Sequence, residues 1–212
     1  MLTLYGHPIS SYTWKALIAL YENDTPFEAV TIDQDTYADF IALWPLGQFP
    51  ALRDSASNAF VTETSCIIEY LDTRYPGPSR FIPRDSAEAL EARRWDRVFD
   101  NNINTMMSKV VVDRIRPEGS KDPYGVEDAR RRVRAAYEVV ERQLGANTFI
   151  VGEAFTLADC AAAPALWYAT RNVPLENKFP RIAAYLERLI SRPSFDRVLR
   201  EKEPLFHLYP GD

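Results

Sequence analysis

The first part of the fold is decided by residues 2–32, LTLYGHPISSYTWKALIALYENDTPFEAVTI. An apolar run at Leu2–Tyr5 is typical of a strand, and apolar residues recur at helical spacing between Trp14 and Tyr21. Alternating side chains at Phe27–Ile32 then indicate a second strand. Because a strand, a helix and a strand follow one another within about thirty residues, the segment predicts a βαβ unit whose strands pair in parallel.

The next segment continues this small domain with shorter elements. The patterns predict a helical piece at 40–43, strands at 51–52 and 59–61, and a helix at 63–75. The sequence Pro-Gly-Pro at 76–78 ends the last of these helices. We therefore place an α/β domain at residues 1–77.

Beyond residue 78 the pattern is helical only, and a linker rich in proline and glycine separates it from the first domain. Helices are expected at 87–116, 128–144, 156–170, 181–190 and 195–200. These segments have no strand between them, so we assign residues 87–212 to an all-helical domain.

Composition limits the possible functions. The chain has 212 residues, is 46% hydrophobic and carries a formal net charge of -5, so it can bury a sizeable core, and its acidic surface does not suit nucleic acid. No apolar run approaches the ~18 residues of a membrane span, and no basic segment followed by an apolar stretch indicates a secretory signal. We expect a cytoplasmic protein with no membrane or nucleic-acid partner, in which Cys66 and Cys160 are reduced and buried.

Two adjacent hydroxyls, Ser10 and Ser11, stand where the first helix begins. A serine there can donate a hydrogen bond to an anion or can cap the helix. Residues 10–13 contain no cysteine, which argues against disulfide chemistry by a thiol of the protein itself. The chain has no Gly-x-Ser-x-Gly elbow of a serine hydrolase, and its distant histidines, His7 and His207, predict no metal site.

The sequence PLGQFPAL at 45–52 places Pro50 at the start of a short strand. Proline lacks the N–H group that a central strand uses. From the motif alone, a trans proline in a surface loop is the commoner arrangement. A cis Phe49–Pro50 bond would instead turn the backbone N–H and C=O of Phe49 outward, where they could pair with an extended peptide.

The sequence FVTETSCIIEYL at 60–71 places Glu63 and Thr64 at the start of a helix. Free N–H groups and the positive end of the helix dipole favour a carboxylate there, and the Glu63 carboxylate could hold an ammonium. Together they could bind both charged groups of an α-amino acid. The alternative is ordinary capping, with Thr62 or Thr64 as the N-cap.

Three motifs follow one another in the chain: the serines after the first strand, GQFP before the third strand and ETS at the start of the third helix. In this order they resemble the N-terminal domain of the cytosolic glutathione transferases. The resemblance covers the whole chain. FIALWPLGQFPAL at 40–52 is similar to that family's turn into its cis-proline. FTLADCAAAPAL at 155–166 is similar to a helix motif of its all-α domain, in which Thr156 and Asp159 would form a capping box.

Within the family, SSYTWKALIAL at 10–20 is most similar to the serine-using zeta and theta-like branches, with Tyr12 in place of the cysteine of zeta proteins. The resemblance implies a thioredoxin-like N-terminal domain that binds glutathione as a co-substrate, followed by an all-α domain. It implies no metal. The glutathione-binding residues would be Ser11, Gln48, Phe49, Pro50, Glu63 and Thr64.

Each of these residues has an implied role. The backbone of Phe49 would pair with the cysteinyl part of glutathione, and Glu63 and Thr64 would hold the γ-glutamyl end. Gln48 would contact the glycyl side, where Gly47 replaces the basic residue of many members. Lys15 is expected on the solvated surface.

The resemblance also implies a catalytic residue, Ser10, whose hydroxyl donates a hydrogen bond to the glutathione thiolate. Ser11 is the second candidate donor, and it could instead cap the helix or contact the backbone of glutathione. Tyr12 and, more weakly, Tyr5 are rival donors, because other branches use tyrosine. The walls of a second-substrate pocket would include Ile9, Tyr12, Met106, Met107 and Val110. A helical stripe with Met106 and Val110 is equally compatible with core packing.

The resemblance therefore implies a detoxifying glutathione S-transferase that activates the thiolate for attack on a small hydrophobic electrophile. A glutathione-dependent isomerase or dehalogenase and a non-catalytic binding protein with the transferase fold are the alternatives. We also expect a homodimer, in which Asp100 or Asn101 could reach the glutathione of the partner.

Overall fold

The computed structural model describes residues 1–210, and within them it has a four-stranded sheet in the order β2-β1-β3-β4. The strands are β1 (Leu2–Gly6), β2 (Phe27–Thr31), β3 (Ala51–Asp54) and β4 (Ala59–Val61). β1 pairs with β2 in parallel, which confirms the predicted βαβ unit, and β3 pairs antiparallel with both β1 and β4.

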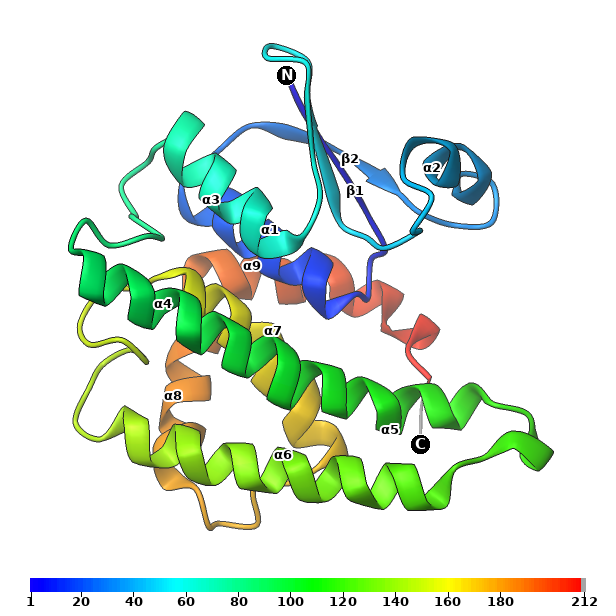
Figure 1. The fold of residues 1–212 in the computed structure, drawn as a ribbon, viewed down its shortest axis with the longest axis vertical. Coiled ribbons are helices and arrows are strands. Elements are labelled where there is room, and N and C mark those ends of the chain that lie inside the picture. The colour runs from blue at the N-terminus through cyan, green and yellow to red at the C-terminus, as the bar shows by residue number, and fades with distance from the viewer. Residues whose placement is uncertain (211–212) are drawn as a thin grey trace.

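Helices cover both faces of this sheet. They are α1 (Ser11–Glu22), α2 (Tyr37–Leu43) and α3 (Thr64–Arg74). α1 and α3 pack on the face that presents Leu2 and Leu4, whereas α2 packs on the other face through Phe40. Figure 1 shows α2 and α3 at opposite sides of the sheet. This mixed sheet with helices on both faces is the predicted thioredoxin-like arrangement.

The remaining chain is mostly helical, as predicted. Its helices are α4 (Ser86–Val98), the π-helical segment η1 (Phe99–Asn104), α5 (Thr105–Ile115), α6 (Pro123–Leu144), α7 (Leu157–Asn172), α8 (Pro180–Ile190) and α9 (Pro193–Lys202), with short 3-10 turns η2 (Glu118–Ser120) and η3 (Glu203–Leu208). α4, η1 and α5 together form the long helix expected at 87–116, and this rod crosses the molecule beneath the sheet (Figure 1).

α6 starts five residues before its predicted N-terminus at 128. The Asp122 side chain accepts a hydrogen bond from the Gly125 N–H at 2.8 Å, and Pro123 occupies the first turn, where no N–H is needed. Asp122 and Pro123, two residue types that are common in loops, therefore begin this helix.

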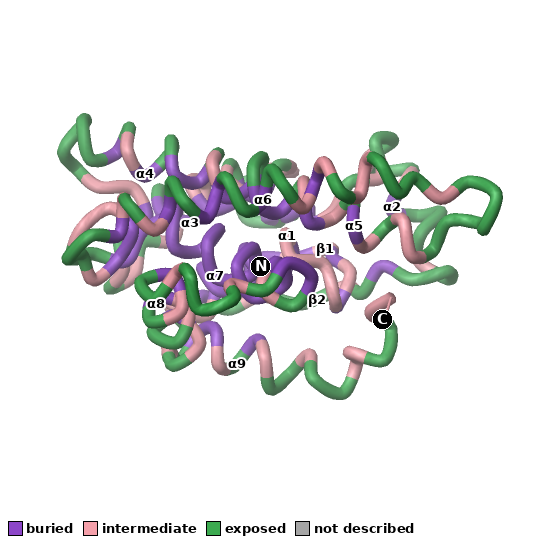
Figure 2. The backbone as a smooth tube through the Cα atoms, turned by 90° about the horizontal axis from the view of Figure 1, so that it is seen from below, coloured by how far each residue is buried: buried purple, intermediate pink, exposed green. Residues whose placement is uncertain are grey.

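α7 joins the two parts of the molecule. The predicted capping box is present at its start, where the Thr156 side chain and the Asp159 carboxylate each accept a backbone N–H. Trp14 of α1 packs against Trp167 and Tyr168 of α7, with ring centroids 4.9 Å apart in both pairs. Figure 2 shows α1 and α7 largely buried near the middle of the molecule. The sheet and the helices therefore share one apolar core.

The domain limits 1–77 and 87–212 stay predictions, and residues 211–212 lie outside the described part. The prediction for one cysteine was wrong: Cys160 is buried in α7, but Cys66 is exposed, because its side chain leaves α3 on the face opposite Ile67 and Ile68. Between residues 1 and 210, no helix is both long and apolar enough to cross a membrane.

Candidate functional site

A cavity of about 450 Å³ lies between the sheet-bearing part and the helical rod. Its lining includes Ser10, Gln48, Phe49, Pro50, Glu63 and Thr64, all named from the sequence as catalytic or glutathione-binding residues. Tyr12, Gly47, Ser65, Arg97, Asp100 and Asn101 complete the lining. Three loops that are far apart in sequence thus meet the rod at one place.

Ser10 is the N-cap of α1. Its Oγ accepts a hydrogen bond from the Thr13 N–H at 3.2 Å, and its backbone is extended (φ -77, ψ 123). Accepting this bond leaves the hydroxyl proton free, so Ser10 can cap the helix and still donate a hydrogen bond into the cavity. Ser11, the first residue of α1, lies elsewhere: it lines a second cavity and does not line the first.

The loop before β3 forms one end of the first cavity. The Phe49–Pro50 bond is cis, the isomer that the resemblance implies. Gly47 has φ +65, a conformation that favours glycine, and its backbone lies against Ile41 and Tyr37. The Phe49 ring stacks on His7 with centroids 5.8 Å apart. Burial lowers the pKa of His7, which is therefore neutral at pH 7.

The other end of the first cavity is the N-terminus of α3. Glu63 is the N-cap residue, but its side chain makes no capping hydrogen bond, and its backbone is left-handed (φ 63, ψ 113). A non-glycine residue in that region is strained, and such strain concentrates at functional sites. Neither Thr62 nor Thr64 occupies the cap position, and no side chain caps this helix. The exposed Glu63 carboxylate and the N–H groups of the first turn therefore stay available at the cavity.

The expectation for Lys15 was wrong. Its side chain is 1% exposed, and its Nζ lies 2.5 Å from Asp96 and 2.7 Å from Asp100 and donates to Ser65 Oγ at 3.0 Å. These bonds tie α1 to α3 and to the rod beneath the first cavity. The sequence signal was present: residues 14–20 have no polar position except Lys15, so no face of this helix could be solvated.

Charge in this buried cluster is balanced by several partners. Burial alone would lower the pKa of Lys15, but the carboxylates of Asp100 and Asp96 outweigh it and raise that pKa. Burial raises the pKa of Asp100 against the opposing effect of Lys15. Arg97 completes the cluster by pairing with Asp96 and Asp100 at the edge of the cavity.

The second cavity, of about 230 Å³, lies beside the first. It is bounded by neutral side chains: Ile9, Ser10, Ser11, Tyr12, Met107, Ser108, Val111, Val112, Tyr168, Tyr209 and Pro210. Three of the residues expected to line the second-substrate pocket line this cavity: Ile9, Tyr12 and Met107. Met106 and Val110, which were also expected there, do not line this cavity. Positions 106 and 110 lie about 100° around α5 from the stripe at 107 and 111.

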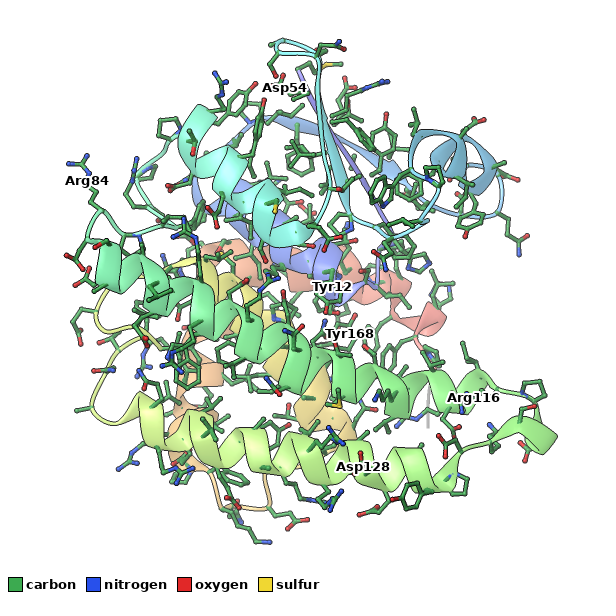
Figure 3. The ribbon with its side chains drawn as sticks, in the orientation of Figure 1. Tyr12, Asp54, Arg84, Arg116, Asp128 and Tyr168 are labelled. Atoms are coloured by element: carbon green, nitrogen blue, oxygen red, sulfur yellow. The ribbon has the colours of Figure 1, made fainter. Side chains whose placement is uncertain are left out.

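Tyr12 stands at the boundary of the two cavities and lines both. Figure 3 shows it where the start of α1 meets the rod, close to Tyr168. Its hydroxyl donates to the Asp100 carbonyl at 3.4 Å and lies 3.5 Å from Thr105 Oγ1. Tyr5 packs against Phe40 and lines neither cavity. Among residues 1–210, no cluster of His, Cys, Asp and Glu side chains could hold a metal ion.

Comparison with known proteins gives a consistent result. Residues 4–79 match the sequence model of the glutathione S-transferase N-terminal domain, and residues 103–193 match that of the C-terminal domain. The chain is 31% identical over 208 residues to glutathione S-transferase 3 of Zea mays, which covers 93% of each protein.

Two further relatives are informative. A glutathione S-transferase from Methylobacterium radiotolerans, solved in complex with glutathione sulfonate, superposes with a TM-score of 0.81 at 30% identity and covers 93% of both chains. FtsZ-localized protein A of Caulobacter vibrioides is 28% identical over 212 residues, covering 95% of this chain and 92% of that protein. The zeta or theta-like branch stays a prediction.

Proposed function

Because this chain belongs to the glutathione S-transferase family, we propose that it activates the glutathione thiol and directs it at a small hydrophobic electrophile. One observation carries this proposal: Ser10 lines both cavities, the polar one that suits a peptide and the apolar one beside it. A sulfur bound next to Ser10 lies at the border where the two substrates meet.

The chemistry requires that the protein stabilise a thiolate. A free thiol has a pKa of about 8.5 and is only a few per cent ionised at pH 7. A hydrogen bond to a charged acceptor contributes about 1.5–3 kcal/mol, and a helix N-terminus about 0.3–2 kcal/mol. Ser10 supplies the hydroxyl, and α1, which it caps, supplies the dipole.

We assign glutathione to the first cavity in one orientation. The γ-glutamyl ammonium pairs with Glu63, and its carboxylate lies at the first turn of α3 with Thr64. The cysteinyl backbone pairs with Phe49 beside Pro50, and the glycyl end lies toward Gln48. Ser11, which faces the second cavity, belongs in this assignment with the electrophile.

The second cavity then receives the electrophile. Its lining carries no ionised side chain among the described residues, and its walls include Ile9, Tyr12 and Met107. A volume of about 230 Å³ suits a small apolar molecule. Removing such a molecule from water also removes water from around the thiolate, which strengthens its nucleophilic attack.

Two other functions use the same site. In a glutathione-dependent isomerase or dehalogenase the thiolate also forms, but glutathione is regenerated or oxidised. In a non-catalytic binding protein with the transferase fold, glutathione would bind without ionising. Formation of a bound thiolate therefore separates the non-catalytic binding protein from both kinds of enzyme, the transferase and the isomerase or dehalogenase.

We further propose that the protein acts as a homodimer in the cytoplasm. The α4 surface supports this, because Leu90 is 65% exposed on the outer side of the rod. Asn101, which is exposed at the edge of the first cavity, is placed to approach a partner. Sedimentation as a monomer at micromolar concentration would contradict the dimer.

The deciding experiment measures the ultraviolet absorbance of the thiolate in the glutathione complex, together with a screen of electrophiles. The proposed function predicts thiolate absorbance below pH 8 and a glutathione conjugate as the product. Regenerated glutathione or its disulfide would identify the second class. Tight binding with no thiolate absorbance and no product would refute the proposal.

A further inference from the structure

A third cavity, of about 470 Å³, adjoins the proposed glycyl end of glutathione. Its lining residues come from the ends of several elements. They are His7 directly after β1, Ile32, Asp33 and Gln34 after β2, Tyr37 at the start of α2, and Phe49 in the loop before β3. No role was predicted for this cavity from the sequence.

The third cavity continues from the first. Phe49 lines both of them. Gly47, which lines the first cavity, lies so close to Tyr37 of the third that a Cβ on it would be 3.1 Å from the tyrosine hydroxyl. If Glu63 holds the γ-glutamyl end, as the proposed function has it, the opposite end of the tripeptide points toward this third cavity.

The charges at this end do not suit a carboxylate. Residues 16–52 contain no lysine or arginine and six acidic residues. Among the described residues that line the first cavity, Arg97 carries a positive charge, but it pairs with Asp96 and Asp100 at the far end. The glycyl carboxylate of glutathione thus has no cationic partner here.

The third cavity adds a negative charge of its own. The Oδ1 of Asp33 accepts the N–H groups of Asp35 and Thr36, each at 3.0 Å, and these bonds lower the pKa of Asp33. His7 provides no compensating charge, because burial lowers its pKa. A free carboxylate would meet repulsion from Asp33, whereas an ammonium would be attracted.

We propose that the third cavity binds a cationic extension of the thiol substrate, namely glutathione whose glycyl carboxylate is amide-linked to an alkyl amine with a free ammonium group. The amide removes the carboxylate charge next to Gln48, and the ammonium pairs with Asp33. This inference rests on the proposed function, because it assumes that glutathione lies in the first cavity with its γ-glutamyl end at Glu63.

The test compares three ligands by calorimetry: glutathione, its glycyl ethylamide and its glycyl 2-aminoethylamide. We expect the aminoethylamide to bind most tightly, about two- to fivefold better than the neutral ethylamide, the range that an exposed ion pair supports. This advantage falls as salt is added, since the pair is exposed. In Asp33→Asn the advantage disappears, while the amide oxygen still accepts the N–H groups of Asp35 and Thr36.

Asp39→Asn is the matched control, because it removes one acidic charge from α2 without touching the three cavities. It should keep the advantage of the aminoethylamide. Gln34→Lys should reverse the order and favour glutathione itself. Two outcomes overturn this inference and leave the proposed function standing. One is an aminoethylamide that binds no more tightly than glutathione or its ethylamide, and the other is an affinity advantage that survives in Asp33→Asn. Failure of all three ligands to bind overturns the proposed function and the inference with it.

Discussion

Replacing Ser10 by alanine should raise the pKa of the bound glutathione thiol by about one to two units. The variant removes the proposed donor to the thiolate, a bond worth about 1.5–3 kcal/mol. Each pKa unit corresponds to about 1.36 kcal/mol, which gives the expected shift. At a pH below both pKa values, the thiolate fraction and the rate of a chemistry-limited reaction should fall about 10- to 100-fold.

The same variant also removes a helix cap, because Ser10 Oγ accepts the Thr13 N–H. Losing a serine cap to alanine costs about 0.5–2 kcal/mol of stability, whereas glycine at a cap costs only a few tenths of a kcal/mol. Ser10→Gly should therefore shift the thiol pKa as Ser10→Ala does, with a smaller loss of stability. This pair of variants separates the two roles of one hydroxyl.

The assay is the pH profile of thiolate absorbance in the glutathione complex, with urea denaturation of each variant alongside. Ser11→Ala, Tyr12→Phe and Tyr5→Phe are controls and should leave the profile in place. The Tyr12 hydroxyl in particular already donates to the Asp100 carbonyl. If Tyr12→Phe moves the profile and Ser10→Ala does not, Ser10 is only a cap and the assignment is refuted.

Three further predictions follow from other parts of the structure. Glu63→Ala and Thr64→Ala should weaken glutathione binding while changing kcat at saturation little, since both residues hold a part of the substrate that does not react; calorimetry showing unchanged affinity in both would contradict this. Lys15→Met should destabilise the fold by about 3–5 kcal/mol in urea denaturation, because Asp96 and Asp100 lose their buried cation; a loss no larger than that of the exposed control Lys109→Met would show that the cluster is not needed. The hydrogen bond that Tyr75 donates to Asp54 raises the pKa of Tyr75 to about 12. The contribution of this bond to stability is therefore present below pH 10 and is lost as the pH rises to about 12. Ultraviolet titration of the parent protein should show a phenol that ionises near pH 12 and that is absent from Tyr75→Phe.

The sequence alone determined the order of elements, and it pointed to those candidate site residues that local geometry makes conspicuous. Alternation and helical spacing in residues 2–32 were sufficient for the βαβ unit, because a parallel pair needs a crossover of that kind. Ser10 and Glu63 could be singled out because each stands at the start of a helix, where unpaired backbone groups are exposed. The cis bond before Pro50 was implied only by the resemblance to the family. The capping box of Thr156 and Asp159 is equally local.

Tertiary packing decided what local patterns leave open. Whether Met107 or its neighbour Met106 faces the second cavity depends on a rotation of about 100° that the packing of α5 fixes. Whether Lys15 is solvated depends on Asp96 and Asp100, which come from the rod 80 residues and more further along the chain. The charge that we propose beside the glycyl end depends on Asp33, which follows β2, lining the same cavity as Phe49, which precedes β3. In each case the deciding partner is distant in sequence, and only the folded chain brings the two together.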